Sequence, residues 1–219
     1  MQLPKQSITN KPYPKTNIDE VGLLHVIEHG FRISTFKDTL LRHSIVAGAE
    51  ESSILVIDIL SVWRSHLLRL EEDENFSKVG VFYMNSTAIL TMENLINFLL
   101  KLNESPAEAL MRCQLQGNYS QQLAGIVIDN ISYFTHDAST VQNSSSYNVF
   151  LKVLKMLRKT FGCWIITVSY GIEYYDGVEN TTKHLNRAGS LTRLPISYTS
   201  EMDAILIRDT ESSARFCSP

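Results

Sequence analysis

The sequence predicts a three-layer α/β domain built around a mostly parallel sheet. Several segments are continuous runs of β-branched residues and leucine, such as "SSILVIDIL" and "CWIITVSY", which is typical of parallel strands covered on both faces. Segments with apolar residues at helical spacing lie between these runs, so strands and helices alternate. With 219 residues, 44% of them hydrophobic, the chain can bury one sizeable core.

The first elements follow an N-terminal arm. Residues 1–18 combine three prolines with lysines and amides, so we expect an extended or disordered arm, followed by a single domain over 19–219. The segment "LLHVIEHGF" predicts a strand that ends at Gly30. A capping hydroxyl and a closing glycine predict a helix over 34–48, and "SSILVIDIL" at 52–60 is the next strand.

The middle of the chain continues the alternation. "KVGVFYMN" at 78–85 predicts a strand, and apolar residues at helical spacing over 92–100 predict a helix. "SPAE" at 105–108 supplies a capping serine, a proline for the first helical position and a capping-box glutamate. The apolar run "LAGIVIDNISYF" at 123–134 predicts another buried strand.

The last third begins with a polar stretch. Residues 135–148 hold too little apolar material to pack and are expected to form a mobile loop. A helix over 149–162 and the strand "CWIITVSY" follow, and then an irregular segment to about residue 200. "EMDAILIRDTESSARFC" predicts two strands joined at 209–213 as an antiparallel hairpin.

Composition restricts the functional classes. The net charge of −3 and pI near 6.1 give no overall basic field, so nucleic acid would have to bind to a local patch. Cys113, Cys163 and Cys217 are far apart and form no CxxC pair, so we expect reduced core thiols and no zinc site or disulfide. No apolar run approaches the roughly 18 residues of a membrane span, and we expect an intracellular, soluble protein.

The sequence lacks a working phosphate loop. A P-loop requires GxxxxGK[ST], so that glycine amides and a lysine reach the phosphates and a hydroxyl holds magnesium. One candidate starts at Gly30, but "GFRISTFK" places Lys37 one position late and has no second glycine. Asp129 ends its strand as a metal-supporting aspartate would. Without the lysine, we interpret it, like Asp58, as the cap of the following turn.

Two further motifs resemble enzyme signatures. "HVIEH", His25 to His29, matches a zinc-protease pattern, but on a strand its histidines would be about 13 Å apart, which favours core or turn histidines. "TVSYG" lacks the first glycine of a serine-hydrolase elbow. We therefore expect no catalytic residue and no metal.

The order of "GIVIDN", "LRKTFGCWIIT", "YDGVEN" and "SEMDAILIR" resembles the RecA-like recombinase core. More closely, these segments are similar to the platinum sensitivity (Psy) subunits of the Shu complex of budding yeast, a family of recombinase paralogues. The resemblance implies that a catalytic glutamate is replaced by Leu60. It also implies that a phosphate-sensing asparagine-glutamine pair is replaced by Ser169 and Tyr170. We therefore expect no bound ATP, no other cofactor and no enzymatic activity.

The resemblance also implies two DNA-facing loops, at about 135–146 and 172–200. The first has no lysine or arginine. The second has no acidic residue from 180 to 200 and holds the candidate DNA-binding residues Lys183, His184, Arg187 and Arg193. In an arbitrary protein these would be interpreted as solvated surface, and only the recombinase-like position favours DNA.

Aromatic and basic residues nearby leave alternatives open. Tyr174 and Tyr175 could stack on bases if exposed, whereas Tyr170 is expected to pack the loop root. A second basic cluster lies on the helix before the strand "CWIITVSY", and a solvated polar face is the favoured interpretation. It consists of Lys152, Lys155, Arg158 and Lys159.

The resemblance implies a non-catalytic subunit that binds single-stranded or junction-containing DNA in the nucleus. It would form a heterodimer with a Csm-like recombinase paralogue, together with further Shu subunits, and promote recombinase filament assembly in homologous recombination and error-free damage tolerance. Two alternatives remain: a protein-interaction scaffold whose partner supplies the DNA contacts, and a degenerate ATPase completed in trans.

Overall fold

The computed structural model describes residues 22–28, 52–70, 80–85, 87, 89–114, 121–135, 140–171, 192–208 and 214–217. In chain order the elements are β1 (Leu23–Glu28), β2 (Ser52–Asp58), α3 (Arg64–Leu70), β3 (Gly80–Asn85), α4 (Met92–Glu104), α5 (Pro106–Leu110), β4 (Gln122–Asp129), the 3₁₀ helix η2 (Ile131–Thr135), α6 (Thr140–Phe161), β5 (Trp164–Tyr170), α8 (Ile196–Thr199), β6 (Ala204–Arg208) and β7 (Ala214–Cys217).

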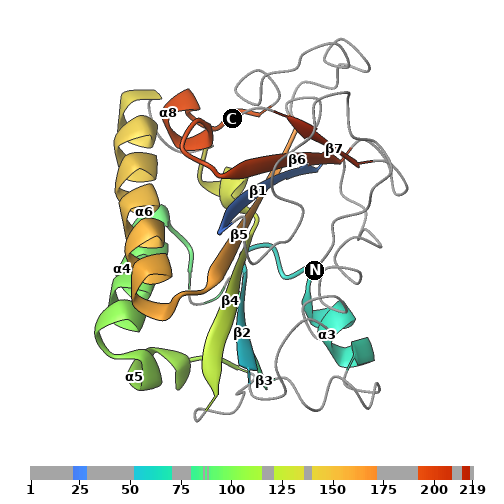
Figure 1. The fold of residues 1–219 in the computed structure, drawn as a ribbon, viewed down its shortest axis with the longest axis vertical. Helices are drawn as coiled ribbons and strands as arrows, with labels where there is room; N and C mark the ends of the chain where they lie inside the picture. Colours follow the sequence, from blue (N-terminus) through green and yellow to red (C-terminus); the bar gives the residue numbers. More distant parts are fainter. Residues whose placement is uncertain are drawn as a thin grey trace.

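The strands form one seven-stranded sheet in the order β3-β2-β4-β5-β1-β6-β7. Every neighbouring pair is parallel except β6 and β7, which pair antiparallel. Helices α4, α5 and α6 lie on one face and α3 on the other (Figure 1). The predicted fold class, a three-layer α/β core with a mostly parallel sheet, is confirmed.

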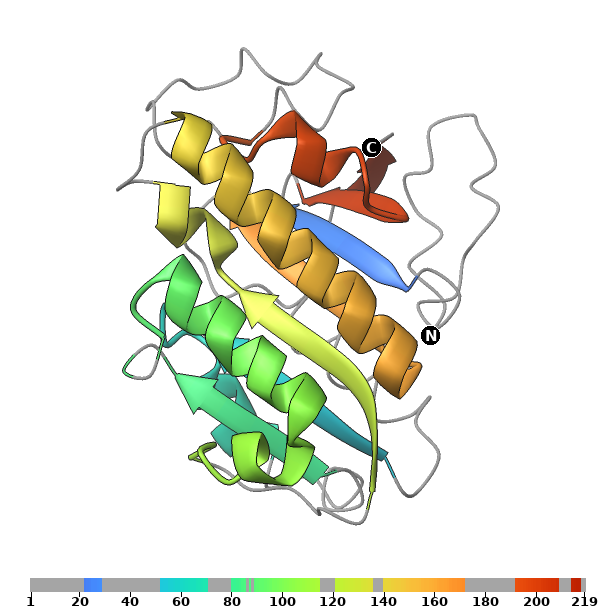
Figure 2. The same ribbon diagram turned by 90° about the vertical axis from the view of Figure 1, so that its left-hand side faces the viewer.

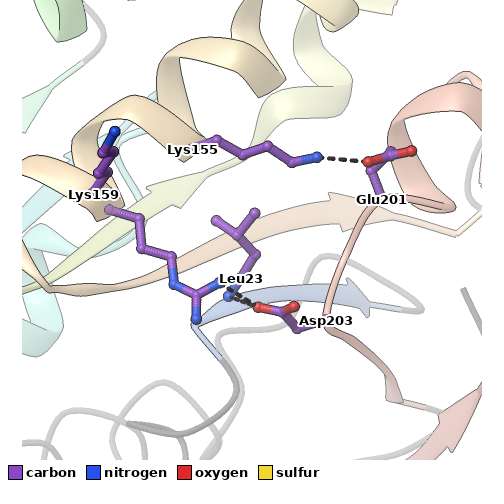
Figure 3. Close-up of a pocket in the computed structure, with 6 residues that line it drawn as sticks. Leu23, Lys155, Lys159, Glu201 and Asp203 are labelled. Atoms are coloured by element: carbon purple, nitrogen blue, oxygen red, sulfur yellow. Dashed lines mark hydrogen bonds and ion pairs between the residues drawn. The ribbon is translucent and has the colours of Figure 1, made fainter.

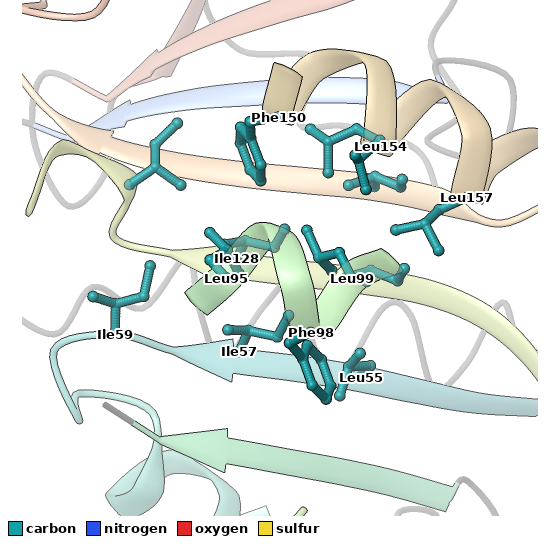
Figure 4. Packing of buried hydrophobic residues seen from close by; sticks show 14 of the residues in the cluster. Leu55, Ile57, Ile59, Leu95, Phe98, Leu99, Ile128, Phe150, Leu154 and Leu157 are labelled. Carbon is teal, nitrogen blue, oxygen red and sulfur yellow. The ribbon is translucent and has the colours of Figure 1, made fainter. Parts of the chain in front are cut away.

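The sheet separates two hydrophobic cores, which explains why its central strands are apolar throughout. Ile57 and Ile128 face the larger core, where they meet residues of α4 and α6 such as Leu99 (Figure 4). The next side chain along each strand points to the opposite face, and Val56 and Val127 belong to the smaller core. Helices α4 and α6 lie side by side across the larger core (Figure 2).

The loop predicted over 135–148 is wrong for most of its length, because α6 already begins at Thr140. Tyr147 explains the difference. Its side chain is fully buried, its hydroxyl donates to the Ile131 carbonyl at 2.6 Å, and its ring packs edge-on against Tyr198. Burial of this aromatic ring offsets the modest helix propensity of the surrounding serines and asparagines. Residues 136–139 lie outside the described part of the chain.

The strand predicted to reach residue 134 ends at Asp129. The following residues form η2, because the Asn130 Oδ1 accepts a hydrogen bond from the Ser132 N–H at 3.0 Å and holds the chain in a turn. Ile131 and Phe134 are buried within this 3₁₀ helix. Their apolar character therefore reflects core packing and not strand structure.

The prediction from "SPAE" is correct for the proline and wrong for the capping box. The proline does occupy the first turn of α5, but the Ser105 side chain makes no capping hydrogen bond. Ser105 also ends α4, where its N–H donates to the Lys101 carbonyl at 2.8 Å, and Glu108 pairs with the Lys101 ammonium group. The predicted capping box is therefore wrong, because its glutamate is engaged elsewhere. Helix α3 has no counterpart among the predicted elements.

Several predictions fall outside the described residues. These are the arm at 1–18, the helix at 34–48, the phosphate-loop positions Gly30 and Lys37, and most of the second DNA-facing loop, with Lys183, His184 and Arg187.

Candidate functional site

The candidate site lies where the parallel strands β2 and β4 end. Ligands of open α/β sheets bind at the carboxyl ends of the strands, and both of these strands end in an aspartate. Asp58 and Asp129 are register partners on the two neighbouring strands. Both side chains are buried, with 0% and 1% of their surface exposed. Buried carboxylates require hydrogen-bond donors, so the donors present determine what the site can do.

Asp58 serves as a structural cap. Its Oδ1 accepts from the Val62 N–H at 2.9 Å, and its Oδ2 accepts from the Trp63 N–H at 2.8 Å. The Tyr83 hydroxyl donates to the same Oδ2 at 2.9 Å. Burial raises the pKa of Asp58, and the hydrogen bonds oppose this shift. The carboxylate closes the turn from β2 into α3, in agreement with its interpretation as a turn cap.

Asp129 is bound by a tryptophan. The Trp63 Nε1–H donates to its Oδ2 at 2.7 Å, and the Trp63 side chain is fully buried in the smaller core. An indole N–H only donates, so it binds the Oδ2 of this carboxylate and cannot itself ligate a metal. Magnesium needs octahedral oxygen ligands, including several waters. A carboxylate that is 1% exposed beneath an indole offers no such site.

The turn after β4 is capped by a different residue from the one predicted. Asn130 performs this role, since its Oδ1 accepts from both the N–H and the hydroxyl of Ser132. The interpretation of Asp129 as the turn cap is therefore corrected. Trp63 was not predicted to contact it. No local signal points to this contact, because "DILSVW" places Trp63 after Asp58, whereas Asp129 lies on a different strand.

The positions that the resemblance assigns to nucleotide chemistry carry no acid or base. Leu60 lies half-buried in the turn after β2. Ser169 and Tyr170 end β5 with 0% and 6% exposure. The Tyr170 N–H donates to the Ser132 Oγ at 3.1 Å, so Tyr170 packs at the root of the second DNA-facing loop, as predicted.

The first histidine of "HVIEH" is a core residue. His25 lies on β1 with no exposed surface, and its ring nitrogens bond the Thr167 Oγ1 at 2.8 Å and the Ser169 Oγ at 2.9 Å. Burial lowers the pKa of His25 to about 3, so the ring is neutral at physiological pH. The preference for a core histidine over a zinc ligand is confirmed at this position, while His29 lies outside the described residues.

Within the described residues, no cluster of three or more histidine, cysteine, aspartate or glutamate side chains could hold a metal ion. Cys113 and Cys163 are buried free thiols, and burial raises the pKa of Cys113 to about 12 and that of Cys163 to about 11. No helix in the described ranges has the length and apolarity needed to span a membrane.

Of the candidate DNA-binding residues, the structure describes Arg193. Its side chain is exposed between two buried neighbours, Thr192 and Leu194, each 3% exposed. Residues 192–195 lie within the predicted DNA-facing loop and lead into α8, which occupies the end of that predicted loop. Arg193 is therefore presented outward from an anchored backbone.

A pocket near the N-terminal ends of β1 and β6 is lined by three residues of the second basic cluster, Lys155, Arg158 and Lys159. This pocket of about 510 Å³ lies between α6 and the segment that precedes β6 (Figure 3). Lys155 pairs with Glu201 at 2.6 Å, and Arg158 pairs with Asp203 at 2.8 Å. Acidic partners thus neutralise part of the cluster, and the solvated-face interpretation remains the favoured one.

The fold and the site together define a three-layer α/β protein with a mostly parallel sheet, in which both strand-end aspartates accept hydrogen bonds from the protein itself. A family model described as Shu complex component Psy3, with a DNA-binding description, matches residues 1–211. Platinum sensitivity protein 3 of Saccharomyces cerevisiae is 37% identical over 200 residues, which cover 87% of this chain and 77% of that protein. The chain therefore belongs to the Psy3 family of Shu complex components.

Two solved structures show looser likeness. A KaiC-like protein of Pyrococcus horikoshii OT3 matches with a TM-score of 0.43 and 14% identity, over 90% of this chain and 80% of the other. The cytoplasmic domain of EssC matches with a TM-score of 0.32 and 12% identity, over 86% of this chain and 33% of the other. At these scores neither likeness bears on function.

Replacing Trp63 should reveal the hydrogen bond to Asp129. Trp63→Phe retains an aromatic ring but removes the indole N–H from a buried carboxylate, so we expect the free energy of unfolding to fall by about 1–3 kcal/mol through the lost bond, in addition to the effect of the smaller ring. Trp164→Phe makes the same ring change in a second buried tryptophan and serves as the control. Equal losses in urea denaturation of the two variants would contradict the assignment.

His25 should make folding stability depend on pH. The pKa of His25 in the folded chain is about 3, below the usual 6.5. Below pH 6.5, His25 therefore binds a proton in the unfolded chain but not in the folded chain. Stability is fully present above pH 6.5 and declines as the pH falls toward 3. Between pH 6.5 and 5 we expect the parent to lose about 1.5 kcal/mol more than His25→Gln. If the free energy of unfolding of the parent and of His25→Gln, measured by chemical denaturation, falls equally with pH, the pKa of His25 is not lowered by folding.

Proposed function

We propose that this chain is a non-catalytic subunit of a Shu-type complex that binds DNA without nucleotide. One observation carries the nucleotide-free part: the buried Trp63 indole donates to Asp129, the aspartate at the end of the strand that would support a metal ion in a RecA-like ATPase. The DNA-binding description of the family supports the other part.

The surrounding positions support the absence of hydrolysis. Leu60 has no group that could activate water, and the buried Tyr170 has no amide that could sense a phosphate. "GFRISTFK" from Gly30 lacks the spacing that a phosphate loop needs. A nucleotide would therefore find neither its phosphate contacts nor its magnesium support in this chain.

DNA would bind to the second loop and its root. Arg193 is exposed near the carboxyl end of β5. In the sequence, Lys183, His184 and Arg187 precede it in a stretch without acidic residues. Lysine and arginine contact phosphate oxygens without regard to base sequence. The expected ligand is therefore single-stranded or junction-containing DNA bound through its backbone.

Membership of the Psy3 family of Shu complex components supports a proposal for the assembly. We propose a nuclear heterodimer with a Csm-like recombinase paralogue, joined by further Shu subunits, in which residues 19–219 form one RecA-like domain. Its recombinase-shaped surface on DNA would promote growth of a recombinase filament in homologous recombination and error-free damage tolerance.

The salt dependence of DNA binding tests this proposal. Each phosphate contact on a single strand contributes roughly 0.7 to the slope of log K against log salt. Removing the three cations in Lys183→Ala/Arg187→Ala/Arg193→Ala should therefore reduce the slope by about 2. Fluorescence anisotropy with a labelled single strand, without ATP, measures this slope.

A matched control removes three cations from the α6 cluster: Lys152→Ala/Lys155→Ala/Lys159→Ala. The control should retain the parent slope. If the loop variant retains it instead, the DNA contacts belong to a partner and the chain acts as a scaffold. A parent complex that binds DNA only with ATP would refute nucleotide independence.

A further inference from the structure

A buried chain of hydrogen bonds connects β1 to the residue before Arg193. Its members are His25, Thr167, Ser169, Thr192 and Tyr198, all of them at most 3% exposed. Polar side chains this deeply buried cost stability unless each is satisfied. The connections among them therefore indicate what they hold in place.

The positions of the protons can be assigned by starting from Tyr198, at one end of this series of hydrogen bonds. The Tyr198 hydroxyl donates to the Thr167 Oγ1 at 2.8 Å. Thr167 has a single proton, which is left for the His25 Nδ1 at 2.8 Å. A neutral imidazole carries its one proton on the other nitrogen, so the His25 Nε2–H donates to the Ser169 Oγ at 2.9 Å.

The last links fix the loop root. The Ser169 hydroxyl lies 3.3 Å from the Thr192 Oγ1 and donates to it. The Leu194 N–H also donates to the Thr192 Oγ1 at 3.4 Å, and the Thr192 hydroxyl donates to the Tyr170 carbonyl at 3.5 Å. The hydroxyls of Thr167, Ser169 and Thr192 thus each donate once and accept at least once. Thr192 is held from the strand on one side and from its own turn on the other.

The end of β5 also contacts η2, the segment that follows β4. The Tyr170 N–H donates to the Ser132 Oγ of η2 at 3.1 Å, while the Tyr170 carbonyl accepts from Thr192. The backbone of one residue, Tyr170, therefore connects the segment after β4 to the segment that leads into α8. In the family resemblance, this strand end carries the phosphate-sensing pair.

We propose that Thr192, fixed by the hydrogen-bond chain from His25, is a positioning residue that pre-organises Arg193 for a DNA phosphate. The inference rests on the proposed DNA-binding function. A fixed backbone on both sides of Arg193 lowers the entropy cost of placing its guanidinium group on a phosphate. The buried hydrogen bonds supply this backbone order without a ligand.

Thr192→Val tests this role, because it keeps the side-chain shape but removes the hydroxyl. We expect the Kd for a labelled single strand to rise roughly three- to tenfold. The slope of log K against log salt should stay at the parent value, because no phosphate contact is deleted. Arg193→Ala, by contrast, should lower the slope by roughly 0.7. Thr192→Ser, which retains the hydroxyl, should restore the parent Kd.

Thr160→Val is the matched control, since its hydroxyl makes an exposed hydrogen bond to Asn103 near the end of α6 that leads into the start of β5, whereas Thr192 lies at the carboxyl end of β5. It should bind as the parent does. Circular dichroism and thermal melting establish that each variant is folded, and Ser169→Ala replaces Thr192→Val if the latter does not fold. A folded Thr192→Val with the parent Kd would overturn the positioning role. A parent that does not bind DNA would instead overturn the proposed function.

Discussion

The hydrogen bond from Trp63 to Asp129 is the interaction on which the rest of this structure depends. Two aspartates end neighbouring strands in the interior, and an unsatisfied buried carboxylate would cost several kcal/mol. The indole reaches one of them from the smaller core, while backbone amides and Tyr83 satisfy the other. The protein's own groups thereby occupy the carboxyl ends of β2 and β4.

The adjacent strand end, that of β5, has a different role. At the end of β5, the Tyr170 N–H donates to Ser132, the Tyr170 carbonyl accepts from Thr192, and Ser169 is bonded to His25. The two segments that leave the sheet here are thus tied to a rigid strand and not to a ligand. Nucleotide-independent DNA binding is the function that this arrangement supports best, because order at the loop root is built into the fold.

The sequence predicted the strands well, because a strand buried on both faces must be apolar at every position. β2, β4 and β5 follow this rule, and the helical spacing over 92–100 likewise identified α4. It failed where tertiary contacts outweigh local preference. The serine-rich start of α6 is helical because Tyr147 packs into the core, and the residues after Asp129 turn because Asn130 caps them.

The site was predicted less completely, since its donors come from distant parts of the chain. The spacing of "GFRISTFK" predicted that a phosphate loop is missing, and the family resemblance implied that Leu60 replaces a catalytic glutamate. That Trp63 would bind Asp129 could not be predicted, because the two lie on different elements and only the sheet register brings them together. The chain of hydrogen bonds from His25 to Thr192 was hidden for the same reason.

The central claim is that Asp129 belongs to the fold and leaves no nucleotide site. Calorimetric titration of magnesium-ATP into this chain, with the tryptophan fluorescence of its Trp164→Phe variant recorded in parallel, tests it most directly. The account predicts no saturable heat at millimolar ATP and an unchanged emission spectrum. Saturable binding accompanied by a shift in tryptophan emission would show that the indole yields its place to a metal-bound nucleotide, and would contradict the account.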